Sequence, residues 1–201
     1  GDAFVGQALP FLGIDITQTL CFFAFWAMHL VFIKHGTESI RWLETFAAPF
    51  LILMGLALLG WAYVNAGGFG EMLSTPSQFV EGGAKEGQFW TAFFAGLTSM
   101  VGFWATMALN IPDFTRFAKS QKDQMLGQAI GLPLPMALFA FIGVAVTSAT
   151  VTIYGEAIWD PVALAGRMGG MGVVLALAAL ALATLTTNLA ANMVAPAYGF
   201  S

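Results

Sequence analysis

The amino-acid sequence predicts an all-α integral membrane protein, a bundle of about five transmembrane helices. Of its 201 residues, 58% are hydrophobic and only 9% are charged, whereas a domain in water carries roughly 25% charged residues. Apolar runs of about 20 residues, the length that crosses a bilayer as a helix, recur along the chain. We expect residues 1–201 to form a single partial transmembrane domain, with the apolar residues 1–13 ending a preceding helix.

The first two predicted spans cover residues 17–33 and 42–65. The first is slightly short and contains His29. The second belongs to a helix with Thr37 as candidate N-cap and a stop at Gly67, because these residue types mark helix ends. Pro49 is expected to kink this helix, because proline removes a backbone hydrogen bond.

The third predicted span, residues 88–109, is interrupted by Gly96, Gly102 and several hydroxyl side chains. Backbone groups freed inside a membrane must be satisfied by protein or by water in a cavity, so this span is a candidate discontinuous helix at a binding site. The alternative is close helix packing through small residues. Trp104 lies deeper in this run than the tryptophans near helix ends, where its flat indole can stack on a planar heterocycle.

The fourth and fifth predicted spans cover residues 124–153 and 170–194. Loops are expected at residues 66–87, 110–123 and 154–161, where glycine, proline and charged residues gather. Lysine and arginine favour the cytoplasmic side of short loops. The segments 34–41 and 110–123 carry most of them, so we expect both on the cytoplasmic side of a multi-pass protein in the plasma (inner) membrane.

The fifth span carries an unusual group of polar residues. Ala183, Thr186 and Thr187 follow the i, i+3, i+4 spacing of one helix face, and their carbonyl and hydroxyl oxygens are hard ligands that suit a small alkali cation. Asn188 and Asn192 form a second i, i+4 pair, and an amide matches the donor and acceptor edge of a uracil or hydantoin ring. The alternative is that these side chains only hold helices together.

Other classes of function find no support in the sequence. His29 and His35 have no neighbouring nucleophile or carboxylate motif, and no cluster of residues resembles a zinc site. The glycine-rich residues 166–170 lack the lysine of a phosphate-binding loop. The net charge of −4 comes without a basic stripe, which disfavours nucleic-acid binding. We therefore expect neither an enzyme nor an organic cofactor.

Four stretches of the chain resemble the nucleobase–cation symporter family 1, which includes bacterial permeases for hydantoins, allantoin, uracil and cytosine. They occur in the family's order and span nearly the whole chain. The stretches are Glu38–Glu44 with Ala48 and Pro49, Ala66–Gly70, Gly102–Thr106 followed by Asn110–Arg116, and Thr187–Asn192.

This resemblance implies a partial LeuT-type bundle, the five-plus-five inverted repeat, covering the end of helix 3 to helix 8. It implies that Trp104 stacks on the substrate ring, that Phe103 and Gly102 line the same site, and that Asn192 hydrogen-bonds the substrate, with Asn188 in support. A sodium site on helix 8 is implied for one further set of residues: Ala183 through its carbonyl, Thr186 and Thr187.

The function implied is import of a small planar heterocycle by symport with Na⁺ or H⁺ and alternating access. The remaining helices of the parent chain would complete the site within the lipid bilayer. The alternative is a membrane receptor or scaffold with the same fold and no transport.

Overall fold

The computed structural model describes residues 9, 13–74 and 76–194, apart from the side chains of residues 104, 106, 107 and 109. Within this part of the chain the regular elements are helices, and no strand occurs. The predicted all-α class is therefore confirmed. Expected elements within residues 1–8, 10–12 and 195–201 lie outside the described residues.

Helices α1 (Ile16–His35) and α2 (Thr37–Asn65) form the first pair. Asp15 caps α1, because its Oδ1 accepts a hydrogen bond from the Gln18 backbone at 2.7 Å, and Gln18 accepts a bond from the Asp15 backbone in return. Gly36 makes the turn between the helices with a φ of 77°, which favours glycine. Thr37 is consequently the first residue of α2 and not its N-cap, and Pro49 lies within α2.

The segment from residue 66 to residue 115 differs from the sequence-based expectation in two ways. The expected loop 66–87 contains a short helix, α3 (Phe69–Leu73). Helix α4 (Phe89–Thr115) is continuous, so the expected break near Trp104 is wrong, and the helix extends into the expected loop 110–123. One glycine costs a helix only about 1 kcal/mol, whereas unsatisfied backbone groups in lipid cost several kcal/mol each.

The expected single helix over residues 124–153 is divided into α5 (Gln121–Gly131) and α6 (Pro133–Tyr154). The division falls at Leu132, whose φ and ψ are −101° and −59°. Pro133 has no N–H to donate, and its ring crowds the backbone of the preceding residue. Pro133 instead begins α6, where a missing N–H leaves no hydrogen bond unmade.

The last region of the chain is built from α7 (Pro161–Met168), α8 (Gly170–Asn188) and the π-helical turn η1 (Leu189–Met193). Asp160 caps α7 by accepting a 2.7 Å hydrogen bond from the Ala163 backbone. Gly169 and Gly170, with φ of 71° and 59°, separate α7 from α8. The helical path over residues 170–194 thus changes from α to π geometry after Asn188.

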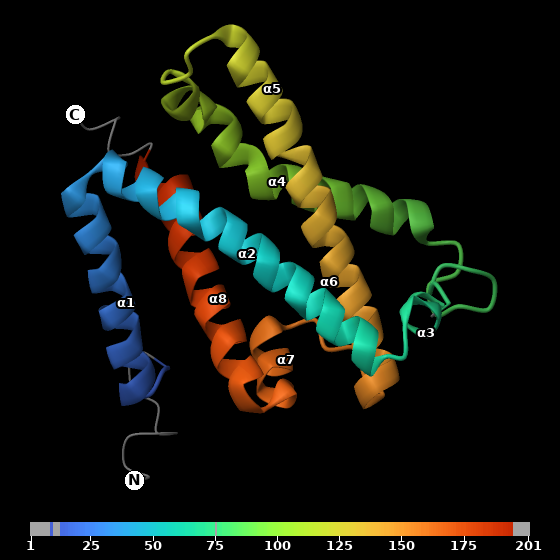
Figure 1. Cartoon of the computed structure of the whole chain (residues 1–201). Helices are drawn as coiled ribbons and strands as arrows, with labels where there is room; N and C mark the ends of the chain where they lie inside the picture. Colours follow the sequence, from blue (N-terminus) through green and yellow to red (C-terminus); the bar gives the residue numbers. More distant parts are fainter. Residues whose placement is uncertain (1–8, 10–12, 75, 195–201) are drawn as a thin grey trace.

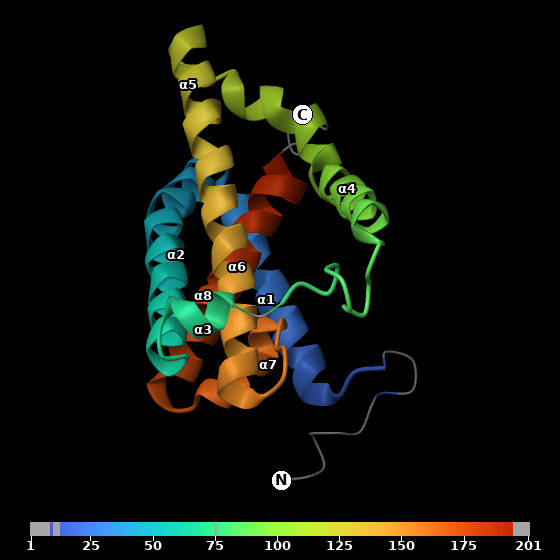
Figure 2. The ribbon, with the colours of Figure 1, turned by 90° about the vertical axis from the view of Figure 1, so that its right-hand side faces the viewer.

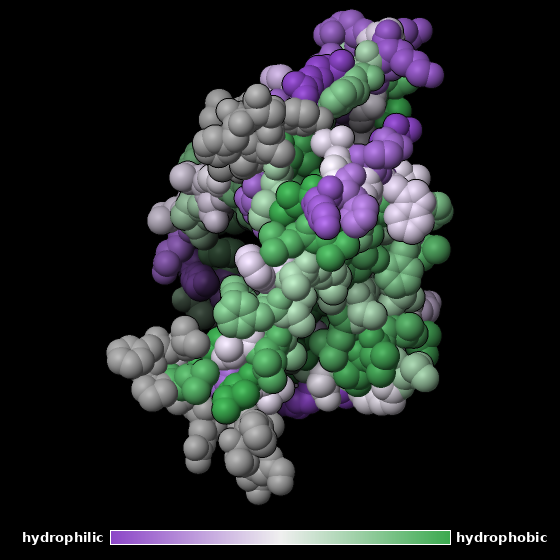
Figure 3. Space-filling view, turned by 90° about the vertical axis from the view of Figure 1, so that its left-hand side faces the viewer, coloured by the Kyte–Doolittle hydropathy of each residue, from purple (hydrophilic) through white to green (hydrophobic). Residues whose placement is uncertain are grey.

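Within the described residues, four helical segments are long and apolar enough to cross a membrane. They are Ile16–His35, Thr37–Asn65, Gln121–Tyr154 and Gly170–Met193, and Phe89–Phe103 is a shorter apolar helix. Many large hydrophobic side chains are exposed, and one face of the molecule is a broad hydrophobic surface between hydrophilic areas (Figure 3). The chain is therefore a multi-pass membrane protein.

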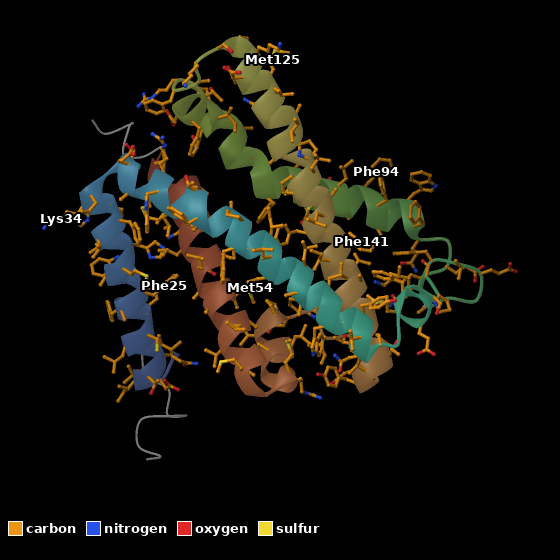
Figure 4. The ribbon with its side chains drawn as sticks, in the orientation of Figure 1. Phe25, Lys34, Met54, Phe94, Met125 and Phe141 are labelled. Carbon is orange, nitrogen blue, oxygen red and sulfur yellow. The ribbon has the colours of Figure 1, made fainter. Side chains whose placement is uncertain are left out.

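Helix α2 packs against α6 and also against α8, and Figures 1 and 2 show it beside both. Towards its C-terminal end, Ala62 and Ala66 join a core with residues of α3, α6 and α7. Towards its N-terminal end, Ile40 and Leu43 join a second core with Leu185, Leu189 and Val194. Phe25 of α1 packs on this second core (Figure 4).

The centre of α2 approaches α6 closely at Gly55. A Cβ atom at this position would lie 2.9 Å from Phe139 Cε1 and 3.3 Å from Ile142 Cδ1. Gly60, on the same helix, has no such neighbour within 4 Å. A side chain at this position would therefore have to displace the Phe139 ring, and glycine avoids this.

We predict that Gly55→Leu destabilises the full-length protein by about 1–3 kcal/mol, because overpacking forces neighbouring side chains and backbone apart. Thermal unfolding in detergent measures the effect, and Gly60→Leu is the matched control. Equal melting temperatures for the two variants would contradict the packing described for Gly55.

Candidate functional site

A hollow of about 420 Å³ opens on the surface of α8 and η1. Four of its five lining residues carry a polar side chain, whereas the rest of α8 is mostly apolar. The lining residues are Ala183, Thr184, Thr187, Asn188 and Asn192. The structure therefore brings together, on one open face, most of the polar residues that the sequence singled out in the fifth span.

The local geometry of this face depends on the π-helical turn Leu189–Met193. Leu189 is fully buried in the core with α2, and the Val194 N–H donates to the Leu189 carbonyl. A π turn holds about one more residue than an α-helical turn. The side chain of Asn192, which lies in this turn, lines the hollow. Single π turns within α-helices occur frequently at functional sites. No residue pattern in the sequence predicted this turn.

The two asparagines of the hollow are bonded to each other. The Asn192 side-chain Nδ2–H donates to Asn188 Oδ1 at 2.6 Å. Asn188 is half-buried and Asn192 is exposed. The pair still has amide donors on Asn188 and a carbonyl acceptor on Asn192 to offer to a ligand.

The three candidate cation ligands are placed differently from one another. Ala183 and Thr187 line the hollow, and the Thr187 side chain is exposed. Thr186 is only 4% exposed, and its hydroxyl donates to the carbonyls of Leu182 and Ala183 at 3.1 Å each. A hydroxyl that donates retains its lone pairs. These oxygens therefore have the donor chemistry of a sodium site, with Thr186 turned toward the helix bundle.

Neither Phe103 nor Gly102 of α4 lines the hollow. Helix α4 makes no extensive contact with α8 in the described part of the chain, and it extends away from the bundle (Figures 1 and 2). Phe103 is 66% exposed, and a Cβ atom added at Gly102 would have no neighbour within 4 Å. The backbone of Trp104 lies in α4, and its side chain is outside the described residues.

Two residues near the second core, His29 and Glu44, have buried polar atoms, and the sequence predicted no function for either. His29 is 4% exposed, and its Nδ1 lies 2.8 Å from the Phe25 carbonyl. A carbonyl only accepts, so Nδ1 is the donor of this hydrogen bond. His29 Nε2 and Glu44 Oε1 have no hydrogen-bond partner within the described structure. A histidine within an apolar run is the feature of the sequence that could have indicated this buried polar group.

Comparison with known proteins finds permeases throughout. Residues 3–201 match the sequence model of a family described as permeases for cytosine and purines, uracil, thiamine and allantoin. The chain is 50% identical over 194 residues to the purine-uracil permease NCS1 of Arabidopsis thaliana, covering 96% of this chain and 31% of that protein. It is 44% identical over 195 residues to the allantoin permease of Bacillus subtilis, covering 96% and 39%.

A more distant relative is the uracil permease of Saccharomyces cerevisiae, 31% identical over 183 residues that cover 87% of this chain and 28% of that protein. The chain thus spans about a third of the length of these relatives. No solved structure matches it.

These matches confirm the resemblance that the sequence motifs indicated, and they agree with the expectation that the chain is not an enzyme. The family match covers residues 3–201 and includes every residue of the hollow. The chain belongs to the family of permeases for cytosine and purines, uracil, thiamine and allantoin.

Proposed function

We propose that the protein containing this chain is a secondary active transporter in the plasma membrane that imports a nucleobase or a related planar heterocycle. The substrate class is that of uracil, allantoin, hydantoin and cytosine, and a cation is carried in the same direction. The observation that supports this most strongly is the polar hollow on α8 and η1 of a permease-family chain.

The substrate ring would contact two helices. Asn192 and Asn188 offer the amide groups that can pair with the edge of a heterocycle. Trp104 would stack on the face of the ring, and Phe103 and Gly102 would line the same space. Because α4 and α8 make no extensive contact in the described residues, helices from the rest of the parent chain would have to complete the site.

The coupling cation would be held by the carbonyl of Ala183 and the hydroxyls of Thr186 and Thr187. Hard oxygen donors favour Na⁺, and H⁺ is the alternative. A bound cation that orders α8 raises the affinity for substrate, and by linkage the substrate raises the affinity for the cation by the same factor. Alternating access of a LeuT-type fold would then release both on the cytoplasmic side.

We predict that Asn192→Ala and Trp104→Ala each reduce uptake of the transported heterocycle at least about fivefold, because one lost stack or amide contact is worth roughly 1–3 kcal/mol. Radiolabelled uracil, allantoin, hydantoin and cytosine are tested with the full-length protein in proteoliposomes. Phe94→Ala is the matched control, since Phe94 is an exposed aromatic residue on the same helix as Trp104 (Figure 4).

Unchanged uptake in both site variants would contradict the site assignment. Binding of a heterocycle without any flux would instead support the receptor or scaffold alternative.

We predict that Thr187→Val raises the sodium concentration for half-maximal uptake at least about tenfold, because valine keeps the shape of threonine and removes the oxygen ligand. Thr184→Val is the control, since Thr184 lines the same hollow while its hydroxyl donates to the Leu180 carbonyl. Uptake by the unmodified protein that does not depend on sodium would exclude sodium coupling and favour protons.

We predict that the segments 34–41 and 110–123 face the cytoplasm. Single cysteines replace the exposed residues Lys119 and Glu81 in a full-length protein without other cysteines. A membrane-impermeant maleimide should label the Glu81→Cys protein in intact cells and the Lys119→Cys protein only after permeabilisation. The opposite labelling pattern would show that these segments face the outside of the cell.

A further inference from the structure

Two buried side-chain atoms on neighbouring helices have no hydrogen-bond partner within the described structure. They are Nε2 of His29 on α1 and Oε1 of Glu44 on α2. Nearly all buried polar atoms in proteins are hydrogen-bonded, so each exception calls for an explanation. Both atoms are already enclosed by described residues, and other helices of the parent chain could not reach them without displacing this core. The explanation therefore lies within this part of the fold.

His29 lies on the side of α1 that packs on the second core. It comes four residues after Phe25 and three before Phe32, and both phenylalanines pack on that core. The His29 ring meets the Phe25 ring edge-on, with 4.7 Å between the ring centroids. The Nδ1 atom is bonded to the Phe25 carbonyl at 2.8 Å, so Nε2 is the ring nitrogen that remains for a second partner.

Glu44 lies on the side of α2 that packs on the same core. It follows Ile40 by four residues and precedes Ala47 by three, and both of these are buried. This is the spacing of residues that share one helix face. Glu44 is half-buried, and its Oε1 atom is enclosed. One end of its carboxylate is therefore held within the protein.

The hairpin of α1 and α2 sets the two side chains at nearly the same height. His29 precedes the turn residue Gly36 by seven residues and Glu44 follows it by eight, so at about 1.5 Å per residue they lie about 10 Å and about 12 Å from the turn. The Ser39 hydroxyl donates to the Phe32 carbonyl at 3.0 Å and ties the helices together beside the turn, from which they diverge (Figure 1). Equal heights on two faces of one core bring the imidazole and the carboxylate within reach, directly or through one water.

Other charged groups around this pair point elsewhere or are absent from the neighbouring helices. Helix α2 packs against α8, and α1 packs against η1, and neither α8 nor η1 contains an acidic, basic or histidine residue. The other titratable side chains of α1 and α2 are exposed: Cys21, Lys34, His35, Glu38, Arg41 and Tyr63. Glu38 and Arg41 pair with each other at 3.4 Å. Within these four elements, Glu44 is the charged group that faces His29.

We propose that His29 and Glu44 together bind one proton, and that this proton holds α1 against α2 beside the buried side of α8. With the proton bound, a donor meets an acceptor, either as imidazolium N–H and carboxylate or as carboxyl O–H and the Nε2 lone pair. Without it, two acceptors face each other in an apolar core, which is unfavourable. The proton belongs to the pair and not to one residue.

The second core connects this proton to the polar hollow. Phe25 and Phe32, which flank His29, pack with Leu185 and Leu189, and the helical path that carries these leucines has the hollow on its other side. Loss of the proton loosens the core that fixes α8, so the protonated pair favours the ordered hollow and the bound substrate. By linkage, substrate binding then takes up a proton. The inference rests on the proposed function and adds a proton to its binding equilibrium.

The test measures equilibrium binding of a radiolabelled ring to the purified full-length protein at saturating sodium. The ring is whichever of uracil, hydantoin, allantoin and cytosine the unmodified protein transports. We expect it to bind at least about fivefold more tightly at about pH 5 than at about pH 8, because histidine titrates in this range and coupling between two sites usually reaches this size. Calorimetry in buffers of different ionisation enthalpy should detect the proton that is taken up.

Glu44→Gln is the most informative variant. Glutamine is nearly the same size as glutamate, and its N–H can donate to His29 Nε2 without a bound proton. Its affinity should therefore stay within about twofold of the tight acidic value over the whole pH range. His29→Leu removes the proton acceptor and should also abolish the pH dependence. If His29→Leu does not fold, Glu44→Gln decides alone.

His35→Gln and Glu38→Gln are the matched controls. His35 lies on the same helix as His29, and its Nδ1 has the same kind of backbone contact, 2.7 Å from the Val31 carbonyl, but its side chain is exposed. Glu38 is an exposed carboxylate on the same helix as Glu44. Both variants should keep the full pH dependence of binding.

The outcomes separate the two proposals. If the unmodified protein binds and transports none of the rings, the proposed function fails and the inference fails with it. If it transports a ring whose affinity does not depend on pH, or if Glu44→Gln keeps the dependence, the inference alone is overturned. A dependence that His35→Gln abolishes would likewise overturn it, because the proton would then bind elsewhere.

Discussion

Helix α2 runs between α6 and α8, and both buried cores of the described chain form along it. Gly55 accommodates its close approach to α6, because an added Cβ there would meet Phe139 at 2.9 Å. At its other end, Ile40 and Leu43 hold the buried side of α8 and η1 through Leu185 and Leu189. Because α8 is fixed on that side, its polar side stays open, and the hollow depends on the packing of α2.

The bilayer explains where the helices of this chain are continuous and where they are interrupted. Lipid offers no hydrogen bonds to free backbone groups, so a weak helix former such as glycine within α4 does not break it. Interruptions occur where the chemistry of the backbone requires one, as at Pro133, which has no N–H, and at Gly169 and Gly170, which have positive φ. The π turn at Leu189–Met193 differs, because it keeps the chain helical while it accommodates an additional residue.

In the candidate site, the two sides of α8 have different surroundings. Leu185, Thr186 and Leu189 are buried against the bundle and position α8, whereas Ala183, Thr187, Asn188 and Asn192 face the hollow. A hydrogen bond joins the two asparagines on this polar side. The chain spans about a third of its curated relatives, which agrees with a site that further helices complete.

The sequence by itself determined the all-α membrane class, the approximate positions of the apolar helices and the family, because hydrophobic run length and short motifs are local properties. It also identified the polar residues 183–192. Only the tertiary structure decided that Thr186 is buried while Thr187 is exposed, that α8 ends in a π turn, and that Asn188 and Asn192 are bonded. The burial of Thr186 and the exposure of Thr187 depend on which side of α8 packs against α2, and that choice is made by contacts between residues more than a hundred positions apart in the chain.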